Sequence, residues 1–250
     1  MKNKVRLLVF ILSIITVFLT YKLYSGQTKK IYYVALGDSV AEGLNPYGKV
    51  EYGYPDFIKD YLEKEDNLKF YTKKFAKSGY TTNDVKNDIE NGKEIEENGE
   101  RINIKKALRE SNLVTVTIGA NDFLRGISFE NLDGKINDVK EMKREVDKIS
   151  KDVKEVLELV KKYAKGNIIL TGYYNPIPRD EAHKELIDEI IKYSNEKYEE
   201  ICDDLNITYV DIFDTIGQNI ELLPSPLDIH PSVKGYEEIA KALIKKINSL

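Results

Sequence analysis

A chain of 250 residues is long enough for one sizeable domain, and its 42% hydrophobic and 32% charged residues are the proportions of a globular protein. The formal net charge of -4 gives no broad basic surface, which argues against nucleic acid as a partner. The only cysteine, Cys202, excludes an intrachain disulfide and a zinc cluster, and a histidine-based mechanism can use only His183 or His230.

The first 24 residues combine positive charge with an apolar segment. Basic residues at positions 2, 4 and 6 precede an apolar run over residues 7–21, which resumes at positions 23 and 24 after Lys22. This pattern is typical of a secretory signal or a signal anchor, and no convincing cleavage site follows it. We therefore expect residues 1–24 to form a single-pass membrane anchor or an uncleaved signal and residues 25–30 a linker. The domain over residues 31–250 is then extracytoplasmic, or secreted if the signal is cleaved.

Strand-like and helix-like segments alternate from residue 31 onward. The strand-like runs cover residues 31–36, 68–76, 113–118, 167–173 and 207–213. Helical patterns cover residues 54–63, 83–90, 102–110, 135–164, 181–205 and 233–247, and apolar residues three or four apart mark one face of the long helix. Such alternation predicts an α/β fold, in which helices cover both faces of a parallel sheet.

Several segments have no assigned role in this scheme. Residues 44–54 and 123–134 are glycine-containing aromatic stretches, and each is either a functional loop or a solvated insertion. The charged runs over residues 94–100 and 140–154 are interpreted as solvated loop and helix faces. We interpret His183 as a structural residue within a charged helix and Cys202 as a half-buried helix residue.

Four short blocks stand at strand ends or before the last helix. Gly37-Asp38-Ser39 follows the first strand, Ser78-Gly79 the second and Gly119-Ala120-Asn121-Asp122 the third, and Asp228-Ile229-His230-Pro231 precedes the last helix. The carboxyl ends of parallel strands meet at one edge of the sheet, where α/β proteins place their ligand crevice. A serine hydroxyl, a backbone N–H, an asparagine amide and an imidazole at that edge are the groups that acyl transfer needs.

In this order, the blocks resemble those of the SGNH, or GDSL-type, hydrolase family, and the resemblance covers the chain from residue 31 onward. Tyr173-Tyr174-Asn175-Pro176 and Gly235-Tyr236 also resemble the bacterial lipase and esterase branch of that family. The resemblance implies a three-layer α/β/α sandwich on a five-stranded parallel sheet, the flavodoxin-like SGNH hydrolase fold. It also implies a serine hydrolase that needs no metal and no organic cofactor.

The resemblance also implies a role for each site residue. Ser39 is the nucleophile and His230 the general base. The backbone N–H groups of Ser39 and Gly79, together with the side chain of Asn121, form the oxyanion hole. Asp38 then stabilises its loop and takes no part in the chemistry.

The chain departs from the family pattern at the residue that orients the histidine. The family usually places an aspartate three residues before the histidine, a position held here by Leu227, whereas Asp228 lies two before His230. Either the Asp228 carboxylate or a backbone carbonyl orients the imidazole, and we expect Asp228.

The expected function is that of a membrane-anchored, extracytoplasmic serine ester hydrolase, lipase-like or specific for short chains, which acts through an acyl-enzyme on Ser39. Residues 47–54 and 123–132, which include Phe129, could form an acyl-binding wall or lid together with Tyr173 and Tyr174. An alternative substrate for the same site is an acetyl group on a cell-wall polysaccharide. A non-catalytic binding protein of the same fold is a further alternative, and it predicts gaps among the site residues.

Overall fold

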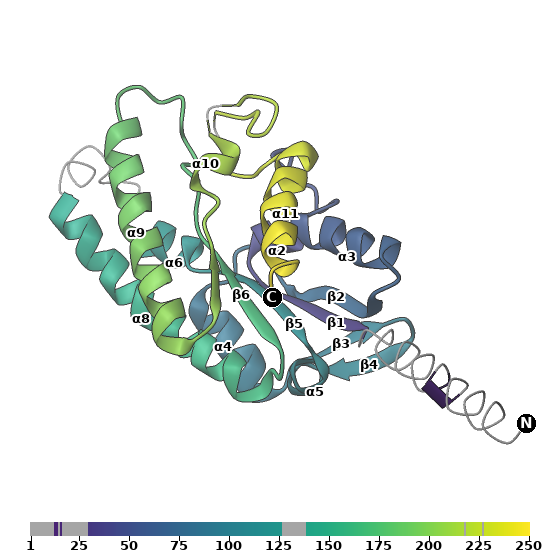
Figure 1. Ribbon diagram of the computed structural model, residues 1–250. Helices are drawn as coiled ribbons and strands as arrows, with labels where there is room; N and C mark the ends of the chain where they lie inside the picture. The colour runs from purple at the N-terminus through teal and green to yellow at the C-terminus, as the bar shows by residue number, and fades with distance from the viewer. Residues whose placement is uncertain (1–12, 15, 17–29, 127–138, 218, 227) are drawn as a thin grey trace, which may run out of the picture. The chain divides into compact units, whose positions relative to one another are not determined.

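The computed structural model describes residues 13–14, 16, 30–126, 139–217, 219–226 and 228–250 (Figure 1). The chain divides into two units, residues 1–30 and 31–250, and the fold described below is that of the second. No helix among the described residues is both long enough and apolar enough to cross a membrane. The apolar run expected to anchor the chain lies almost entirely outside those residues.

Five parallel strands form the central sheet, as the sequence predicts. They are β1 (Ile31–Gly37), β2 (Leu68–Ala76), β5 (Leu113–Thr117), β6 (Asn167–Thr171) and β7 (Thr208–Val210), in the spatial order β2-β1-β5-β6-β7. Each pair of neighbours is parallel, so all carboxyl ends meet at one edge. That edge carries the blocks that follow β1, β2 and β5.

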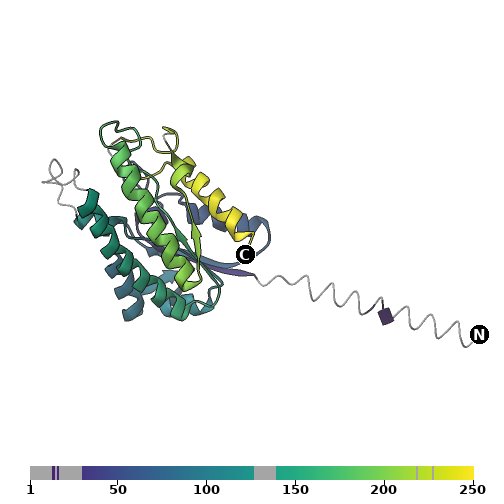
Figure 2. The same ribbon diagram turned by 60° about the vertical axis from the view of Figure 1, so that its left-hand side comes forward.

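Two layers of helices cover the sheet, which confirms the predicted α/β/α sandwich (Figures 1 and 2). Helices α3 (Tyr54–Lys64) and α11 (Val233–Ile247) pack on one face. The other face carries α4 (Thr82–Asn91), α5 (Ile104–Glu110), α8 (Val139–Tyr163) and α9 (Lys184–Leu205). Along β1, Tyr32, Val34 and Leu36 enter the second of these layers, while Tyr33 and Ala35 enter the first, which is the alternation that a strand buried on both faces requires.

A β-hairpin replaces part of the expected loop and helix between β2 and β5. Strands β3 (Glu94–Glu97) and β4 (Glu100–Asn103) pair antiparallel, and α5 begins only at Ile104. The two residues between these strands, Asn98 and Gly99, have φ values of 54° and 80°, the left-handed conformation that a two-residue hairpin turn needs. The acidic run over residues 94–100 is therefore a hairpin, and its Asn-Gly pair was the sequence signal for it.

Three short helices and two side chains also differ from expectation. Helices α2 (Ser39–Glu42), α6 (Ala120–Gly126) and α10 (Phe213–Ile216) occupy stretches in which the sequence predicts no helix. The side chain of Cys202 is completely buried in the core, not half-buried. His183 lies at the N-cap position of α9 without a side-chain capping bond, and α9 starts three residues later than predicted.

Candidate active site

The turn after β1 places Ser39 at the start of a helix. Gly37 has a φ of +134°, and a Cβ atom there would lie 1.9 Å from the Thr117 carbonyl oxygen, so only glycine fits. The Asp38 side chain then accepts the Val40 backbone N–H at 3.0 Å and caps α2. The serine therefore occupies the first position of α2, where a backbone N–H has no partner within the helix.

Ser39, His230 and Asp228 form a continuous hydrogen-bonded series. The Nε2 atom of His230 lies 2.8 Å from the Ser39 hydroxyl oxygen, and its Nδ1 atom lies 2.7 Å from an Asp228 carboxylate oxygen. The same carboxylate oxygen accepts the His230 backbone N–H at 2.8 Å. Asp228 thus reaches the imidazole although it stands one position later than the family pattern has its aspartate.

The three side chains differ in their exposure. The exposed fraction is 7% for Ser39, 12% for the side chain of His230 and 33% for that of Asp228. The reacting groups are therefore shielded from bulk water, while the outer end of the series remains in contact with solvent.

The segment that carries His230 is fixed from both sides. The buried Tyr174 hydroxyl donates to the carbonyl oxygen of Ile229 at 2.7 Å, directly between Asp228 and His230. On the other side, Ser232 caps α11, because its hydroxyl accepts the Gly235 backbone N–H at 3.1 Å. Tyr174, which the sequence suggests for an acyl-binding wall or lid, supports the histidine segment from within the core.

The turn after β2 brings Gly79 to the same edge. The Lys77 backbone N–H donates to the Gly37 carbonyl at 3.0 Å, which ties this turn to the end of β1. Tyr80 N–H donates back to the Lys77 carbonyl at 3.1 Å, and Gly79 has a φ of +81°. These are the features of a type II turn, in which glycine is favoured at the third position.

Asn121 reaches this turn from helix α6. Its side-chain amide donates to the Tyr80 carbonyl at 2.9 Å. The next residue, Asp122, accepts the hydroxyl of Thr82 at 2.6 Å and also its backbone N–H. Helix α6 is thereby fastened to the N-terminus of α4, and the Asn121 amide is held beside the Gly79 turn.

Burial changes the acidity of the carboxyl next to the serine. Desolvation raises the pKa of Asp38 to about 7, the bond from the Val40 N–H opposes the rise, and the charge of Asp122 adds to it. Burial likewise raises the pKa of Tyr54, whose hydroxyl bonds to Thr117 beneath the site, to about 12. A buried carboxyl that caps α2 fits the stabilising role expected of Asp38.

The two aromatic loops are only partly at the surface. Tyr47 and Tyr52 are exposed, with 77% and 37% of their area accessible, whereas Tyr54 is completely buried at the start of α3. The stretch from Phe123 forms the end of α6 up to Gly126. Residues 127–138, which include Phe129, lie outside the described part of the chain.

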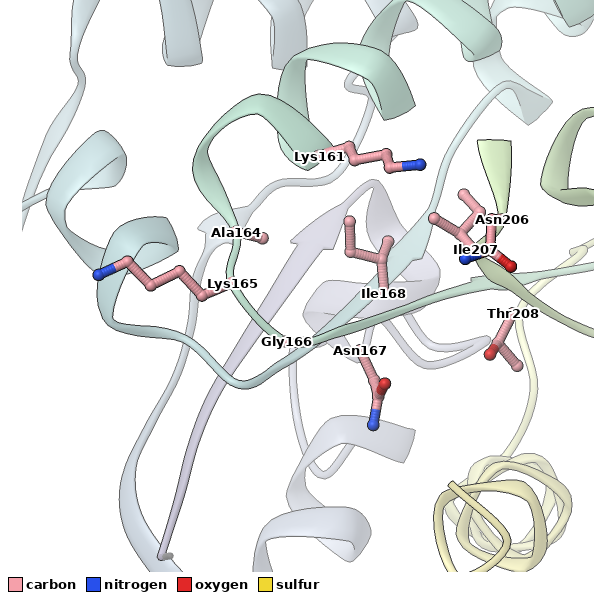
Figure 3. A pocket seen from close by; sticks show the side chains of 9 residues that line it. All are labelled: Lys161, Ala164, Lys165, Gly166, Asn167, Ile168, Asn206, Ile207 and Thr208. Carbon is pink, nitrogen blue, oxygen red and sulfur yellow. The ribbon is translucent and has the colours of Figure 1, made fainter. Parts of the chain in front are cut away.

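A separate hollow lies at the opposite edge of the sheet (Figure 3). It is lined by the end of α8 and the amino ends of β6 and β7, and Figure 3 shows Lys161 extending across it while Lys165 points away. The amino ends of these strands are remote from Ser39. In the described ranges, no three His, Cys, Asp or Glu side chains come close enough together to hold a metal ion.

A three-layer sandwich with serine, histidine and aspartate in series at the carboxyl edge of its sheet is the architecture of a serine ester hydrolase. The chain belongs to the GDSL-like lipase/acylhydrolase family, whose model matches residues 35–238. It is accordingly a carboxylic ester hydrolase of the GDSL type.

Solved structures share the fold of this chain. A lipase from a goat rumen metagenome is 25% identical, with 87% of this chain and 97% of its own covered at a TM-score of 0.66. An extracellular lipase from Streptomyces rimosus is 16% identical, over 87% and 99% of the two chains, at a TM-score of 0.63. An acetylxylan esterase from Geobacillus stearothermophilus is 18% identical, over 88% and 94%, at 0.59. No curated protein matches the chain.

Proposed function

We propose that the chain hydrolyses carboxylic esters through an acyl-enzyme on Ser39. The observation that carries the proposal is the series in which His230 bonds to Ser39 at 2.8 Å and to Asp228 at 2.7 Å. A nucleophile within hydrogen-bond reach of a base, with the base oriented by a third group, is the arrangement that activates a serine hydroxyl.

Each reacting group has a defined task. The Ser39 oxygen attacks the ester carbonyl carbon while its proton passes to Nε2 of His230, and the imidazolium then gives that proton to the leaving alcohol. Asp228 holds the Nδ1 proton and stabilises the charged ring. In the second step, His230 takes a proton from a water molecule, whose oxygen attacks the carbonyl carbon of the acyl-enzyme. The bond to the Ser39 oxygen then breaks, His230 returns the proton to that oxygen, and the carboxylic acid leaves.

Three donors are proposed for the oxyanion that forms in both steps. They are the backbone N–H groups of Ser39 and Gly79 and the side-chain amide of Asn121. An asparagine amide carries two N–H donors, so one can bind the Tyr80 carbonyl while the other turns toward the substrate. Loss of one such donor typically reduces kcat by about 10² to 10³.

A fluorophosphonate probe tests the nucleophile directly. The serine oxygen displaces fluoride from phosphorus, so wild-type protein should become labelled and Ser39→Ala should not. His183→Ala is the matched control, because this histidine also bonds to an aspartate, Asp180, but lies at the start of α9. A folded wild-type protein that never labels would favour the alternative of a non-catalytic binding protein.

The acyl group is the finer part of the proposal. A lipid or short-chain ester is our first candidate, supported by the exposed aromatic residues Tyr47 and Tyr52 in the loop after α2. An acetyl group on a cell-wall polysaccharide is the second, favoured by the similarity of fold to a protein described as an acetylxylan esterase. Hydrolysis of p-nitrophenyl acetate with no turnover of p-nitrophenyl octanoate and longer esters would exclude the lipase hypothesis.

We also propose that the N-terminal segment holds the catalytic domain at the outer face of a membrane. The basic start and the apolar run over residues 7–21 support this proposal. The full-length protein should then sediment with membranes and resist carbonate extraction, while external protease removes the domain. Recovery of full-length protein in the soluble fraction would contradict it.

A further inference from the structure

The turn that carries the Gly79 N–H is of a type that can adopt a second conformation. Rotation of the peptide between Ser78 and Gly79 by about 180° converts a type II turn into type I, and it points that N–H to the opposite side. Glycine adopts both conformations with little steric cost, and Ser78 carries no proline ring to fix the turn. Bonds to the flanking peptides fix where this turn lies relative to Ser39, and these bonds come from outside the turn.

Glu42 supplies a restraint on one side of this peptide. Its carboxylate accepts the Ser78 backbone N–H at 2.6 Å and also the Ser78 hydroxyl, both on the same oxygen. Glu42 is the last residue of α2, the helix that begins with Ser39. The carboxylate thus fixes the peptide that precedes the rotatable one and links it to the helix of the nucleophile.

Arg125 supplies a restraint on the other side. Its guanidinium group donates to the Gly79 carbonyl oxygen at 2.8 Å, which fixes the peptide that follows the rotatable one. Arg125 belongs to α6, the helix that also carries Asn121. Both flanking peptides are therefore held by charged side chains, each from the helix that carries another oxyanion donor.

We propose that Glu42 is a positioning residue that holds the turn of Gly79 at a fixed place beside Ser39, so that its N–H can serve the substrate oxyanion. The proposal rests on the esterase function proposed above and adds to it a residue that touches neither substrate nor the reacting atoms. The shared carboxylate makes α2 and the Gly79 turn move together, so the distance between the attacking oxygen and the oxyanion donor stays constant. Displacement of such a group by about 1 Å can reduce a rate by 10²-fold.

Helix α2 does not itself depend on Glu42. Its N-terminus is capped by the Asp38 side chain, and Gly43, the residue that follows the helix, donates its N–H to the Ser39 carbonyl at 2.9 Å. Gly43 adopts the left-handed conformation, with a φ of 90°, that ends helices. Removal of the Glu42 carboxylate should therefore release the Gly79 turn while the serine stays in place.

Steady-state kinetics with three substitutions at position 42 tests the proposal on the purified protein with p-nitrophenyl acetate. Glu42→Ala should lower kcat by about 10- to 100-fold with KM within about threefold. Glu42→Gln should retain most of kcat, because its amide oxygen can accept both Ser78 donors. Glu42→Asp keeps the charge but shortens the reach by about 1.5 Å, so it should lose more activity than Glu42→Gln. The reverse order would mean that charge matters rather than position, and it would overturn the proposal.

A matched control and a double mutant identify the route of the effect. Glu97→Ala removes a carboxylate that likewise accepts a neighbouring hydroxyl, that of Thr72 at 2.9 Å, and it should leave kcat unchanged. In a cycle with Gly79→Ala, the loss from Glu42→Ala should largely disappear, since both changes release the same N–H. Additive losses would show that Glu42 acts elsewhere.

The outcome also separates this inference from the proposed function. Wild-type protein that hydrolyses the ester, combined with an unchanged kcat in Glu42→Ala, would overturn the inference alone. Wild-type protein that neither labels with fluorophosphonate nor hydrolyses any ester would overturn both. Should Glu42→Ala fail to fold, the comparison of Glu42→Gln with Glu42→Asp decides.

Discussion

One carboxylate oxygen of Asp228 bonds to both the backbone N–H and the ring Nδ1 of His230, at 2.8 and 2.7 Å. An aspartate side chain commonly accepts the N–H of the second residue after it, which forms an Asx turn. Here this local turn also orients the imidazole. A spacing of two residues therefore brings the carboxylate to the imidazole Nδ1 atom, where the family usually has a spacing of three.

Removal of the Asp228 charge should cause a large loss of kcat. In Asp228→Asn the amide can donate to Nδ1, which favours the tautomer that leaves Nε2 protonated and unable to accept the serine proton. The equivalent change in the best-studied serine protease lowers kcat by about 10⁴, and we expect a loss of about 10² to 10⁴, measured with a p-nitrophenyl ester.

Asp180→Asn provides the matched control for this experiment. Asp180 accepts from His183 at 2.8 Å, in a second Asp–His pair that is well exposed. Its replacement should leave kcat within about twofold. A loss of only a few-fold in Asp228→Asn would mean that a backbone carbonyl, and not the carboxylate, orients the ring.

Gly79→Ala should reduce kcat strongly and lower the free energy of unfolding modestly. A Cβ atom at Gly79 would have no neighbour within 4 Å, so the substitution acts only through the φ of +81°. A non-glycine residue there costs about 1–2 kcal/mol, which favours rotation of the turn and loss of the oxyanion donor. We expect kcat to fall by about 10².

Gly99→Ala tests whether backbone strain alone explains that loss. Gly99 has a φ of +80° and equally open surroundings, but it lies in the hairpin turn between β3 and β4. Gly99→Ala should lower the midpoint of thermal unfolding by about as much as Gly79→Ala does, and it should leave kcat unchanged. Equal kinetic losses in the two variants would contradict a specific role for Gly79.

The sequence predicts the layers and the strands of this fold well because both depend on local patterns. The apolar runs and helix periods decide which segments pair and pack, and the blocks at Ser39, Gly79, Asn121 and His230 stand at predicted strand ends or just before the last helix. The sequence analysis does not predict the β3–β4 hairpin, although Asn98-Gly99 is a typical hairpin turn. The reason is that charged residues in these strands are equally typical of a solvated face. Glu42 could not be found in this way, since its partner Ser78 is 36 residues away and no periodicity links the two.

The buried carboxyl of Asp38 should make stability depend on pH. Burial raises its pKa to about 7, whereas the pKa of an aspartate in an unfolded chain is about 3.9. Between these values the folded state holds a proton that the unfolded state has lost. The free energy of unfolding is therefore unaffected by this group below about pH 4, falls between about pH 4 and 7, and changes no further above that window.

Asp38→Asn should remove this loss, because the amide does not ionise and still offers an oxygen to the Val40 N–H. Urea unfolding of both proteins at pH 4.5 and 7.5 measures the difference. The variant should gain a few kcal/mol relative to wild type on going to the higher pH, at about 1.4 kcal/mol for each unit of pKa difference. Parallel pH curves for the two proteins would show that Asp38 titrates normally.

Gly119 should tolerate no side chain. Its φ is +112°, and a Cβ atom would lie 2.3 Å from the Tyr198 hydroxyl and 2.6 Å from that of Tyr173. The hydroxyls of Tyr198 and Tyr173 both donate to the carbonyl of Ile118, at 3.3 and 2.7 Å. Moving them away from a new Cβ atom would break these hydrogen bonds. Gly119→Ala should lower the free energy of unfolding by about 2–4 kcal/mol.

Two further variants separate crowding from backbone strain at this position. Gly48 also has a positive φ, +73°, but open surroundings, so Gly48→Ala should cost only about 1–2 kcal/mol. Tyr198→Phe removes the nearest oxygen and should recover part of the loss when combined with Gly119→Ala. If the double variant is no more stable than Gly119→Ala, the loss in the free energy of unfolding comes from backbone strain alone.

The serine and its base lie 191 residues apart in the chain, and this separation affects biosynthesis. Ser39 is synthesised early, but His230 is delivered only when α11 docks, with buried Tyr236 donating to the Leu44 carbonyl at 2.6 Å. A ribosome-bound chain that has not yet produced α11 therefore carries a serine with no base beside it. Under the proposed mechanism, the chain would be inert until α11 docks and would gain its reactivity in the step that completes the fold.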